Sequence, residues 1–249
     1  MTSRFLRPAL LCAGLLPAGA MAAASILIWP VDPTLPAGKN ATELWLENRG
    51  NTSAVMQVRV VSWQQENGYE RYRPQQDVVA SPPMISLSAG GKQLIRLIKQ
   101  SPVPAGQERA WRIVIDEIPP AAGAGGGPSG LKLQMRYSIP LFAYGEGLAP
   151  AQGGDGAPGV DPAGISWRVA QVDGSPALQV QNRGRVHLRL SQVSLSSGGA
   201  PREMAQGLLG YVLPGQTRSW PLPAGMSHPT RLSATINAKP AVWQSPAQN

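Results

Sequence analysis

One segment near the middle of the chain constrains the fold more than any other. Residues 131–142 read LKLQMRYSIPLF: every odd position from Leu131 to Leu141 is apolar, and the even positions up to Ser138 are polar or basic. A period of two places the apolar side chains on one face of an extended strand, whereas a helix would scatter them around its axis. We call residues 131–142 the alternating segment and predict that it forms a β-strand.

The alternating segment also predicts an unusual sheet edge. Pro140 has no backbone N–H to donate, so we expect at least that end of the strand to lie at an edge. A long edge strand with an unbroken apolar row is an aggregation hazard unless another chain pairs with it. The pattern alone leaves two interpretations open: an ordinary strand with one face in the core, or a strand that is lent to a partner.

The composition favours an all-β protein. Of the 249 residues, 28 are glycine and 25 are proline, and only 14% are charged. This mixture is typical of short strands joined by turns and is unfavourable for long helices. The net charge of +8 suits acidic partners. Because the basic residues are scattered rather than clustered, a solvated basic surface is the better interpretation, and we expect no nucleic-acid partner.

The first 24 residues have the pattern of a secretory signal peptide. Arg4 and Arg7 precede an apolar run from Ala9 to Leu16, and small residues occupy most of positions 20–24. The apolar run is too short to span a bilayer, so we expect export without a membrane anchor. The only cysteine, Cys12, lies in this segment. The exported protein is therefore expected to have no disulfide and to depend on its hydrophobic cores.

The remainder of the chain divides into two sets of strand signals. Residues 25–144 and 165–249 each contain several short apolar or alternating runs, and residues 145–164 are rich in Gly, Pro and Ala, as in a linker or insertion. Short strands at this spacing predict two immunoglobulin-like β-sandwiches. The expected strands are 25–33, 41–48, 53–63, 81–87, 92–99, 109–118 and 131–142, followed by 165–172, 178–182, 186–195, 208–212, 218–222 and 232–238.

The sequence contains no pattern that predicts catalysis or a metal site. His187 and His228 are isolated, with no Ser/His/Asp arrangement, and the glycine-rich residues 123–130 lack the lysine of a phosphate-binding loop. We therefore expect no enzyme activity, cofactor or metal. Four tryptophans at strand spacing favour core positions over a sugar-stacking surface. They are Trp29, Trp45, Trp63 and Trp111.

Several short stretches, taken in order, resemble a known family. They are LWLEN (44–48), Trp63, SPPM (81–84), Gly90 with QLIRL (93–97), WRI (111–113), EIPP (117–120) and the final PLF of the alternating segment. In this order they resemble the PapD-like periplasmic chaperones that assemble fimbriae together with an outer-membrane usher. The strand that ends at Trp63 and the SIPLF ending at 138–142 are most similar to the archaic, spore-coat-U-type branch.

The resemblance implies a fold and a function. The two immunoglobulin-like domains would be set at an angle, as an L or boomerang, in a non-enzymatic periplasmic protein. The first domain would lend its last strand to a pilus subunit that lacks one of its own, and the complex would then pass to the usher. An added strand satisfies the open sheet edge of the subunit, and its alternating side chains fill the apolar groove. The corresponding groove-filling positions are Leu131, Leu133 and Met135, continued by Tyr137 and Ile139.

The chain departs from the family at the site that anchors the terminal carboxylate of the subunit. The family uses two basic residues, but the corresponding positions here are Val31 and approximately Pro140, which carry no charge. Another basic side chain is therefore required, and arginine suits the role because it can bind a carboxylate through two parallel hydrogen bonds. The candidates are Arg96, Arg136 and Lys132. The alternative for Arg96 is a structural ion pair with Asp116 or Glu117. The alternative for Arg136 and Lys132 is a solvated strand face.

A rival interpretation is an exported β-sandwich adhesin or fimbrial structural subunit that binds carbohydrate. Such a subunit is normally a single domain with a donor extension at its N-terminus and often a disulfide. Here the alternating segment lies in the middle of a chain with two predicted domains. A basic protein with an exposed apolar edge is also able to pair with a second copy of itself when no subunit is bound.

Overall fold

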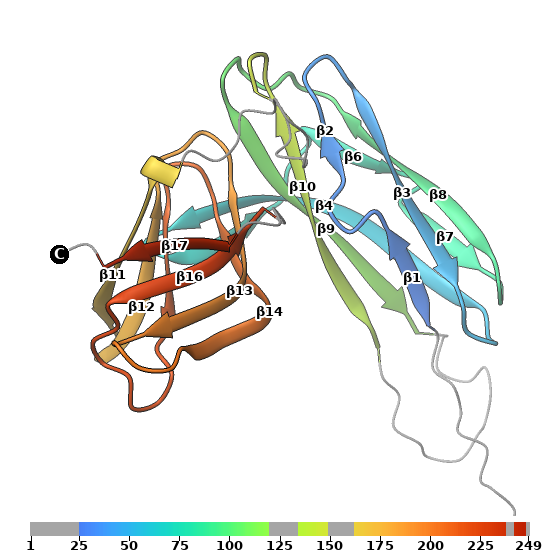
Figure 1. Cartoon of the computed structure of the whole chain (residues 1–249). Helices are drawn as coiled ribbons and strands as arrows, with labels where there is room; N and C mark the ends of the chain where they lie inside the picture. The colour runs from blue at the N-terminus through green and yellow to red at the C-terminus, as the bar shows by residue number, and fades with distance from the viewer. Residues whose placement is uncertain (1–24, 120–133, 149–161, 238–241, 248–249) are drawn as a thin grey trace, which may run out of the picture.

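The structure, a computed structural model, describes residues 25–119, 134–148, 162–237 and 242–247. These residues form β-strands and a 3-10 turn at Pro162–Gly164. The strands build two β-sandwiches that lie at an angle to each other, so that the molecule has the shape of a boomerang (Figure 1). The prediction of two immunoglobulin-like sandwiches arranged as an L is confirmed.

The first sandwich packs two sheets face to face. One sheet has the strand order β1-β3-β8-β6, and the other has the order β2-β10-β9-β4-β5, with β7 also paired to β4. The strands are β1 (Ile26–Trp29), β2 (Thr34–Leu35), β3 (Ala41–Asn48), β4 (Ala54–Glu66), β5 (Tyr69–Arg73), β6 (Val78–Ser81), β7 (Met84–Leu87), β8 (Lys92–Lys99), β9 (Glu108–Ile118) and β10 (Arg136–Tyr144). The alternating segment thus contributes most of β10, next to β9.

The second sandwich follows the 3-10 turn. Its sheets have the orders β11-β12-β15 and β14-β13-β16-β17. The strands are β11 (Ile165–Val172), β12 (Ser175–Asn182), β13 (Leu188–Ser196), β14 (Arg202–Val212), β15 (Thr217–Pro221), β16 (Arg231–Ile236) and β17 (Val242–Pro246). The sequence patterns missed β17 and the first half of β14, where irregular register against β13 breaks the alternation.

Alternation along the strands fills the two cores. In the first sandwich, every second residue of β3, β8 and β9 is buried between the sheets, as a period of two requires. Trp111 and Trp63 are almost fully buried, as predicted. Trp29 and Trp45 differ from the prediction: they are only partly buried and stack on each other on the outer face of the first sheet, with ring centroids 6.1 Å apart.

Both sandwiches use the same device where a strand ends. Asn48 at the end of β3 and Asn182 at the end of β12 are each followed by Arg-Gly, and each accepts a hydrogen bond from the glycine N–H through Oδ1, at 3.0 and 2.8 Å. Each side-chain amide also donates to two backbone carbonyl groups. Burial of these polar side chains is tolerable because their hydrogen bonds are made. The repeated Asn-Arg-Gly is visible in the sequence, but we did not predict its role.

Gly145, directly after β10, offers a test of how tightly the end of this strand is packed. A Cβ at this position would lie 1.9 Å from the carbonyl oxygen of Pro104 and 2.6 Å from its carbon. Because both contacts are with backbone, Gly145→Ala is expected to lower the free energy of unfolding by about 2 kcal/mol, measured by urea denaturation. Gly199→Ala is the control, since no atom lies within 4 Å of its Cβ. Equal stability of the two variants would contradict the packing described.

Candidate functional site

The outer edge of β10 is the most unusual feature of the first sandwich. On its inner side β10 pairs with β9 from Arg136 to Tyr144. On its outer side it pairs only with β2, at Phe142 and Ala143. The N-terminal part of the first domain pairs with β3 through β1. It then crosses to the other sheet, where β2 pairs with the end of β10 (Figure 1). Within the described residues, the edge from Arg136 to Leu141 therefore has no strand beside it.

The backbone groups that face this free edge follow from the register. The N–H of Glu117 donates to the carbonyl oxygen of Met135 at 3.0 Å, which marks a hydrogen-bonded pair. Such pairs alternate along an antiparallel ladder, so Arg136, Ser138 and Pro140 turn their backbone groups away from β9. The N–H that proline lacks is therefore one that would point outward. Pro140 removes no bond from the ladder with β9, and the expectation that it lies at an edge is met.

The structure divides the predicted row of apolar side chains into two parts. Leu131 and Leu133 lie outside the described residues. Met135 comes just before β10 and is 43% exposed. Tyr137 packs against the core of its own domain, and its hydroxyl hydrogen-bonds the backbone of Ile26. Ile139 is only 7% exposed and belongs to that core. The apolar row is therefore not available to a partner along its whole length.

The predicted basic candidates are not brought together. Arg96 lies on β8 in the other sheet, beside Glu43 and Ser81, and is exposed, with no ion pair among the described residues. Arg136 lies on β10, and its side chain is 69% exposed, but Nε donates to Oδ1 of Asp116. Lys132 lies outside the part of the chain that the structure describes.

Asp116 also binds Arg59, whose Nη2 lies 2.6 Å from Oδ2. The carboxylate considered as a partner for Arg96 is thus shared by Arg59 and Arg136. Burial alone would raise the pKa of the Asp116 carboxyl, but the hydrogen bonds and charges of the two arginines outweigh burial and hold the pKa below its ordinary value.

The lowered pKa of Asp116 predicts a pH-dependent contribution to stability. Since the pKa is lower in the folded than in the unfolded state, the contribution is present at neutral pH and is lost as the pH falls through the folded value. Asp116→Asn is expected to lower the free energy of unfolding by about 1 kcal/mol at neutral pH, and the difference from the parent protein should shrink on acidification below about pH 4. Urea titrations at several pH values measure it, and a difference independent of pH would contradict the assignment.

The two sandwiches meet in a small aromatic core of their own. Phe142 and Tyr144 of β10 and Trp63 of β4 pack against Tyr211 and Leu213 of the second sandwich. The Trp63 ring lies 5.4 Å from the Tyr211 ring, edge to face, and 5.7 Å from the Phe142 ring, distances typical of favourable aromatic pairs. After Leu141, where the free edge ends, β10 is therefore buried on both faces: one face packs on its own core and the other packs against the second domain.

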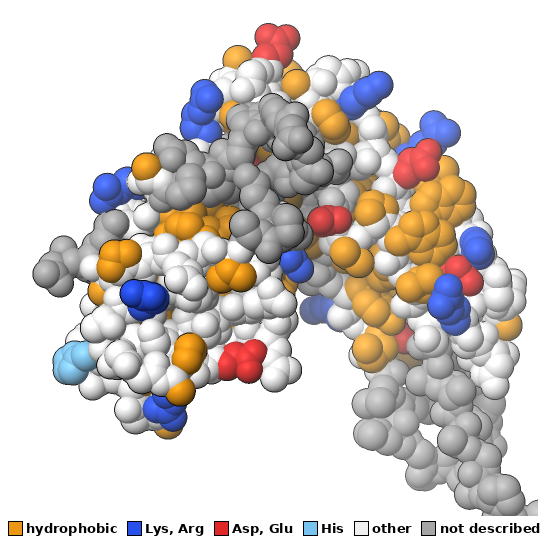
Figure 2. All heavy atoms as spheres, in the orientation of Figure 1, with side chains coloured by type: hydrophobic (Ala, Val, Ile, Leu, Met, Phe, Trp, Pro, Cys, Tyr) orange, Lys and Arg blue, Asp and Glu red, His pale blue; other side chains and the backbone are white. Residues whose placement is uncertain are grey.

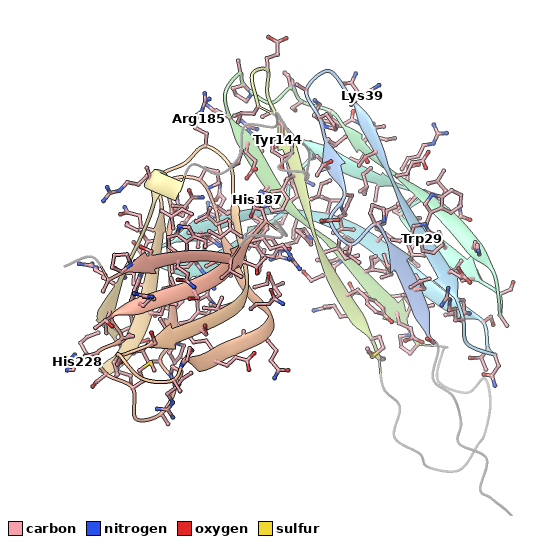
Figure 3. The ribbon with its side chains drawn as sticks, in the orientation of Figure 1. Trp29, Lys39, Tyr144, Arg185, His187 and His228 are labelled. Carbon is pink, nitrogen blue, oxygen red and sulfur yellow. The ribbon has the colours of Figure 1, made fainter. Side chains whose placement is uncertain are left out.

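A carboxylate completes the junction. Glu108 accepts hydrogen bonds from the backbone N–H of His187 at 3.0 Å and contacts His187 Nδ1 at 2.9 Å. The His187 ring stacks on Phe142 with centroids 3.5 Å apart. Tyr144 and His187 converge from the two domains (Figure 3). Burial, together with the charge and hydrogen bond of Glu108, raises the pKa of Tyr144 well above its ordinary range, so that its hydroxyl remains protonated. His187 therefore has a structural role at the domain junction.

Arg112 is the cation that the sequence interpretation missed. It lies on β9 directly opposite Pro140, with its guanidinium carbon 3.8 Å from the centre of the Trp63 ring and 5.3 Å from that of Tyr211. It hydrogen-bonds the side chain of Tyr72, its buried Nε has no hydrogen-bond partner, and it makes no ion pair with a described residue. A guanidinium that is stacked but not paired with a carboxylate is a suitable site for one.

The sequence held a signal for Arg112. It alternates with Trp111 and Ile113, so it had to lie on the face of its strand opposite the core. The candidates named from the sequence lie on β8 and on the alternating segment, whereas the register places the charge of Arg112 on β9, at the level of Pro140.

The described residues contain no group of three or more His, Cys, Asp or Glu that could hold a metal ion. His228 is exposed on the second domain. No helix long and apolar enough to cross a membrane occurs in the described ranges. Two sandwiches with an unpaired strand edge next to their junction form a class of proteins to which a partner strand can be added at that edge, by β-augmentation.

Comparison with known proteins identifies the family within this class. Residues 31–149 match the model of the pili and flagellar-assembly chaperone, PapD N-terminal domain. Over 131 residues the chain is 26% identical to the probable fimbrial chaperone YehC of Escherichia coli K12, covering 51% of this chain and 53% of that protein. The chain thus matches about half the length of this curated relative.

Solved structures extend the similarity to both domains. The chain is 30% identical, with a TM-score of 0.70, to a chain of the CsuC–CsuE chaperone–subunit complex from the archaic Csu pili of Acinetobacter baumannii, covering 90% of this chain and 98% of that one. A Salmonella enterica structure of SafA pilin with the SafB chaperone has the same fold, with 19% identity, a TM-score of 0.65, and coverage of 91% and 98%. The protein belongs to the PapD-like family of pilus-assembly chaperones.

Proposed function

We propose that this protein is a periplasmic chaperone that binds pilus subunits by donor-strand complementation and delivers them to an outer-membrane usher. The observation that carries the proposal is the free outer edge of β10, which directly follows the apolar residues of the alternating segment. A subunit that lacks one strand could pair with the outward backbone groups of Arg136 and Ser138. The proposed groove-filling side chains are Leu131, Leu133 and Met135.

The two later members of the row have a different role in this proposal. Tyr137 and Ile139 pack on the core of their own domain and would form the base of the lent strand. Their packing fixes the register of β10 against β9, so that the residues before β10 begin from a defined position on the first sandwich. Contact of Tyr137 with the subunit remains part of the proposal because this side chain is only partly buried.

Arg112 is the basic side chain that we propose as the anchor for the terminal carboxylate of the subunit. It lies at the level of Pro140, the position where the family pattern would place a charge, and has no carboxylate partner. Arg136 is a weaker candidate because Asp116 already binds it, and Arg96 is weaker because it lies on the other sheet. Lys132 remains a secondary candidate on sequence grounds.

We propose that the outer face of the first sheet makes a second contact, with the usher. Hydrophobic side chains gather on the first sandwich over β1, β3 and β8 (Figure 2). The stacked Trp29 and Trp45 belong to this face, and the Lys92 ammonium lies 5.9 Å from the centre of the Trp29 ring. This surface belongs to the sheet that does not contain β10, so it would stay accessible while β10 holds a subunit.

Isolation of the complex tests the proposal. The full chain, with its leader at residues 1–24 and a C-terminal affinity tag, is expressed in its native host and purified from the periplasmic fraction. A small β-sandwich subunit should co-purify in equimolar amount, and the leader should be absent from the mature N-terminus by mass spectrometry. Recovery of the tagged chain without any subunit, from cells that assemble the pilus, would contradict the proposal. Size measurement of the free chain shows whether it pairs with a second copy.

A further inference from the structure

The hairpin of β4 and β5 carries a network of hydrogen bonds and ion pairs between the two domains. The Gln65 side chain on β4 is only 3% exposed. Its Nε2 donates to the carbonyl oxygen of Tyr211 at 3.0 Å, and its Oε1 accepts from the N–H of Leu213 at 2.9 Å. The amide therefore pairs with the end of β14 as a strand backbone would, and joins the two domains.

The tip of the same hairpin makes further contacts with the second domain. Arg218 on β15 donates to the carbonyl oxygen of Gly68 at 2.8 Å and forms an ion pair with Glu70 at 3.3 Å. The hydroxyl of Tyr69 donates to Asp173, in the turn between β11 and β12, at 3.2 Å. The hairpin of the first domain is thus attached to three separate parts of the second, and in Figure 1 it extends across to that domain.

This network ends at Arg112. Glu70 accepts a hydrogen bond from the indole N–H of Trp63, and Gln65 Nε2 lies 3.3 Å from the same carboxylate. The Trp63 ring supports the guanidinium of Arg112 from one domain, and Tyr211, whose carbonyl group binds Gln65, approaches it from the other. The placement of the second domain and the orientation of Arg112 are therefore connected through the contacts of a few side chains.

We propose that the β4–β5 hairpin is a strut that orients Arg112 for the terminal carboxylate of a subunit, with Gln65, Glu70 and Arg218 as positioning residues. The proposal rests on the function proposed above. A guanidinium recognises a carboxylate through a planar fork of N–H groups, so its direction matters as well as its charge. Stacking between Trp63 and Tyr211 restricts that direction only while the two domains keep their relative position.

The first measurement follows the distance between the domains. Because the only cysteine, Cys12, lies in the leader, spin labels can be attached to Lys39→Cys and His228→Cys, which are exposed on different domains (Figure 3). Pulsed dipolar spectroscopy should give one narrow distance distribution for the parent protein. Gln65→Met with Arg218→Met should broaden it, whereas the control Arg71→Ala, an exposed arginine on the same hairpin, should leave it unchanged.

The second measurement separates positioning from structure. The probe is a synthetic peptide of the last strand of the subunit that co-purifies with the chain, made with a free carboxylate and with a terminal amide. The parent protein should bind the acid about tenfold more tightly than the amide, the value of one charge-assisted hydrogen bond. In Gln65→Met with Arg218→Met, and in Glu70→Gln, this preference should fall to about twofold while amide binding is retained.

The outcomes distinguish this inference from the proposed function. Failure of the parent protein to bind either peptide or the whole subunit would overturn the proposed function, and the strut with it. A broadened distance distribution with the preference for the acid intact would overturn only the positioning role. Thermal unfolding of each variant checks that it is folded, and Glu70→Gln, which keeps the size of the side chain, provides a milder variant if the double substitution does not fold.

Discussion

Replacing Leu133 and Met135 together with glutamate is expected to abolish the capture of pilus subunits by this chaperone. Burying each parent side chain in the groove of a subunit would contribute about 1.5–3 kcal/mol, and a carboxylate in that groove would be unpaired. The loss of affinity should therefore be at least about a hundredfold. Co-purification of the subunit from the periplasm measures it.

A matched pair of substitutions controls for charge. Gln134→Glu with Ser138→Glu adds the same two negative charges at even positions of the alternating segment, so the apolar row is intact. This variant should retain most of the capture. Ile139→Ala should act differently, by lowering the stability of the free protein by about 2–5 kcal/mol, because Ile139 belongs to its own core. Normal pilus assembly with glutamate at both 133 and 135 would exclude the proposed use of this segment.

The second large effect is expected at Arg112. Arg112→Met keeps the aliphatic part of the side chain against Trp63 but removes the charge, and should weaken subunit binding by about 2–5 kcal/mol, thirtyfold or more. The same experiment with Arg96→Ala is expected to give affinity close to that of the parent protein, since Arg96 lies on the other sheet.

A subunit lengthened by a few glycines at its C-terminus distinguishes anchoring from general destabilisation. The extension moves the carboxylate away from the junction, so the parent protein should lose affinity for it, and Arg112→Met should show little further loss. If Arg96→Ala abolishes binding while Arg112→Met binds normally, the anchor lies elsewhere and the assignment of Arg112 is wrong.

Much of the fold could be predicted from local pattern. The strands β3, β8, β9 and β11 match the expected ranges to within about one residue, because each buries one face and so keeps a period of two. The patterns failed at β14, where irregular register against β13 disturbs the alternation, and at β17, whose outward side is exposed. The strand that was expected to end at Trp63 continues to Glu66 in β4, where the side chain of Gln65 is bound by the second domain.

The candidate site was predictable only in part. The free edge could be anticipated because Pro140 and an unbroken apolar row are properties of consecutive residues. The basic group could not be found in the same way. Arg96 and Arg136 were chosen for their neighbours in sequence, whereas Arg112 reaches the junction through its register opposite Pro140 and through Trp63, a residue 49 positions away by the numbering of the chain.

The sequence by itself determined that this protein is built from short strands, that residues 136–142 belong to an alternating strand, and which family it resembles. The first two properties depend on side-chain order along single strands, where a period of two is enough to assign a face. The resemblance depends on short motifs spread from residue 44 to residue 142. Only the tertiary structure decided where that strand turns from an open edge into core, and which arginine stands at the domain junction. Both depend on strand register and on contacts between residues far apart in the chain, and no local pattern encodes them.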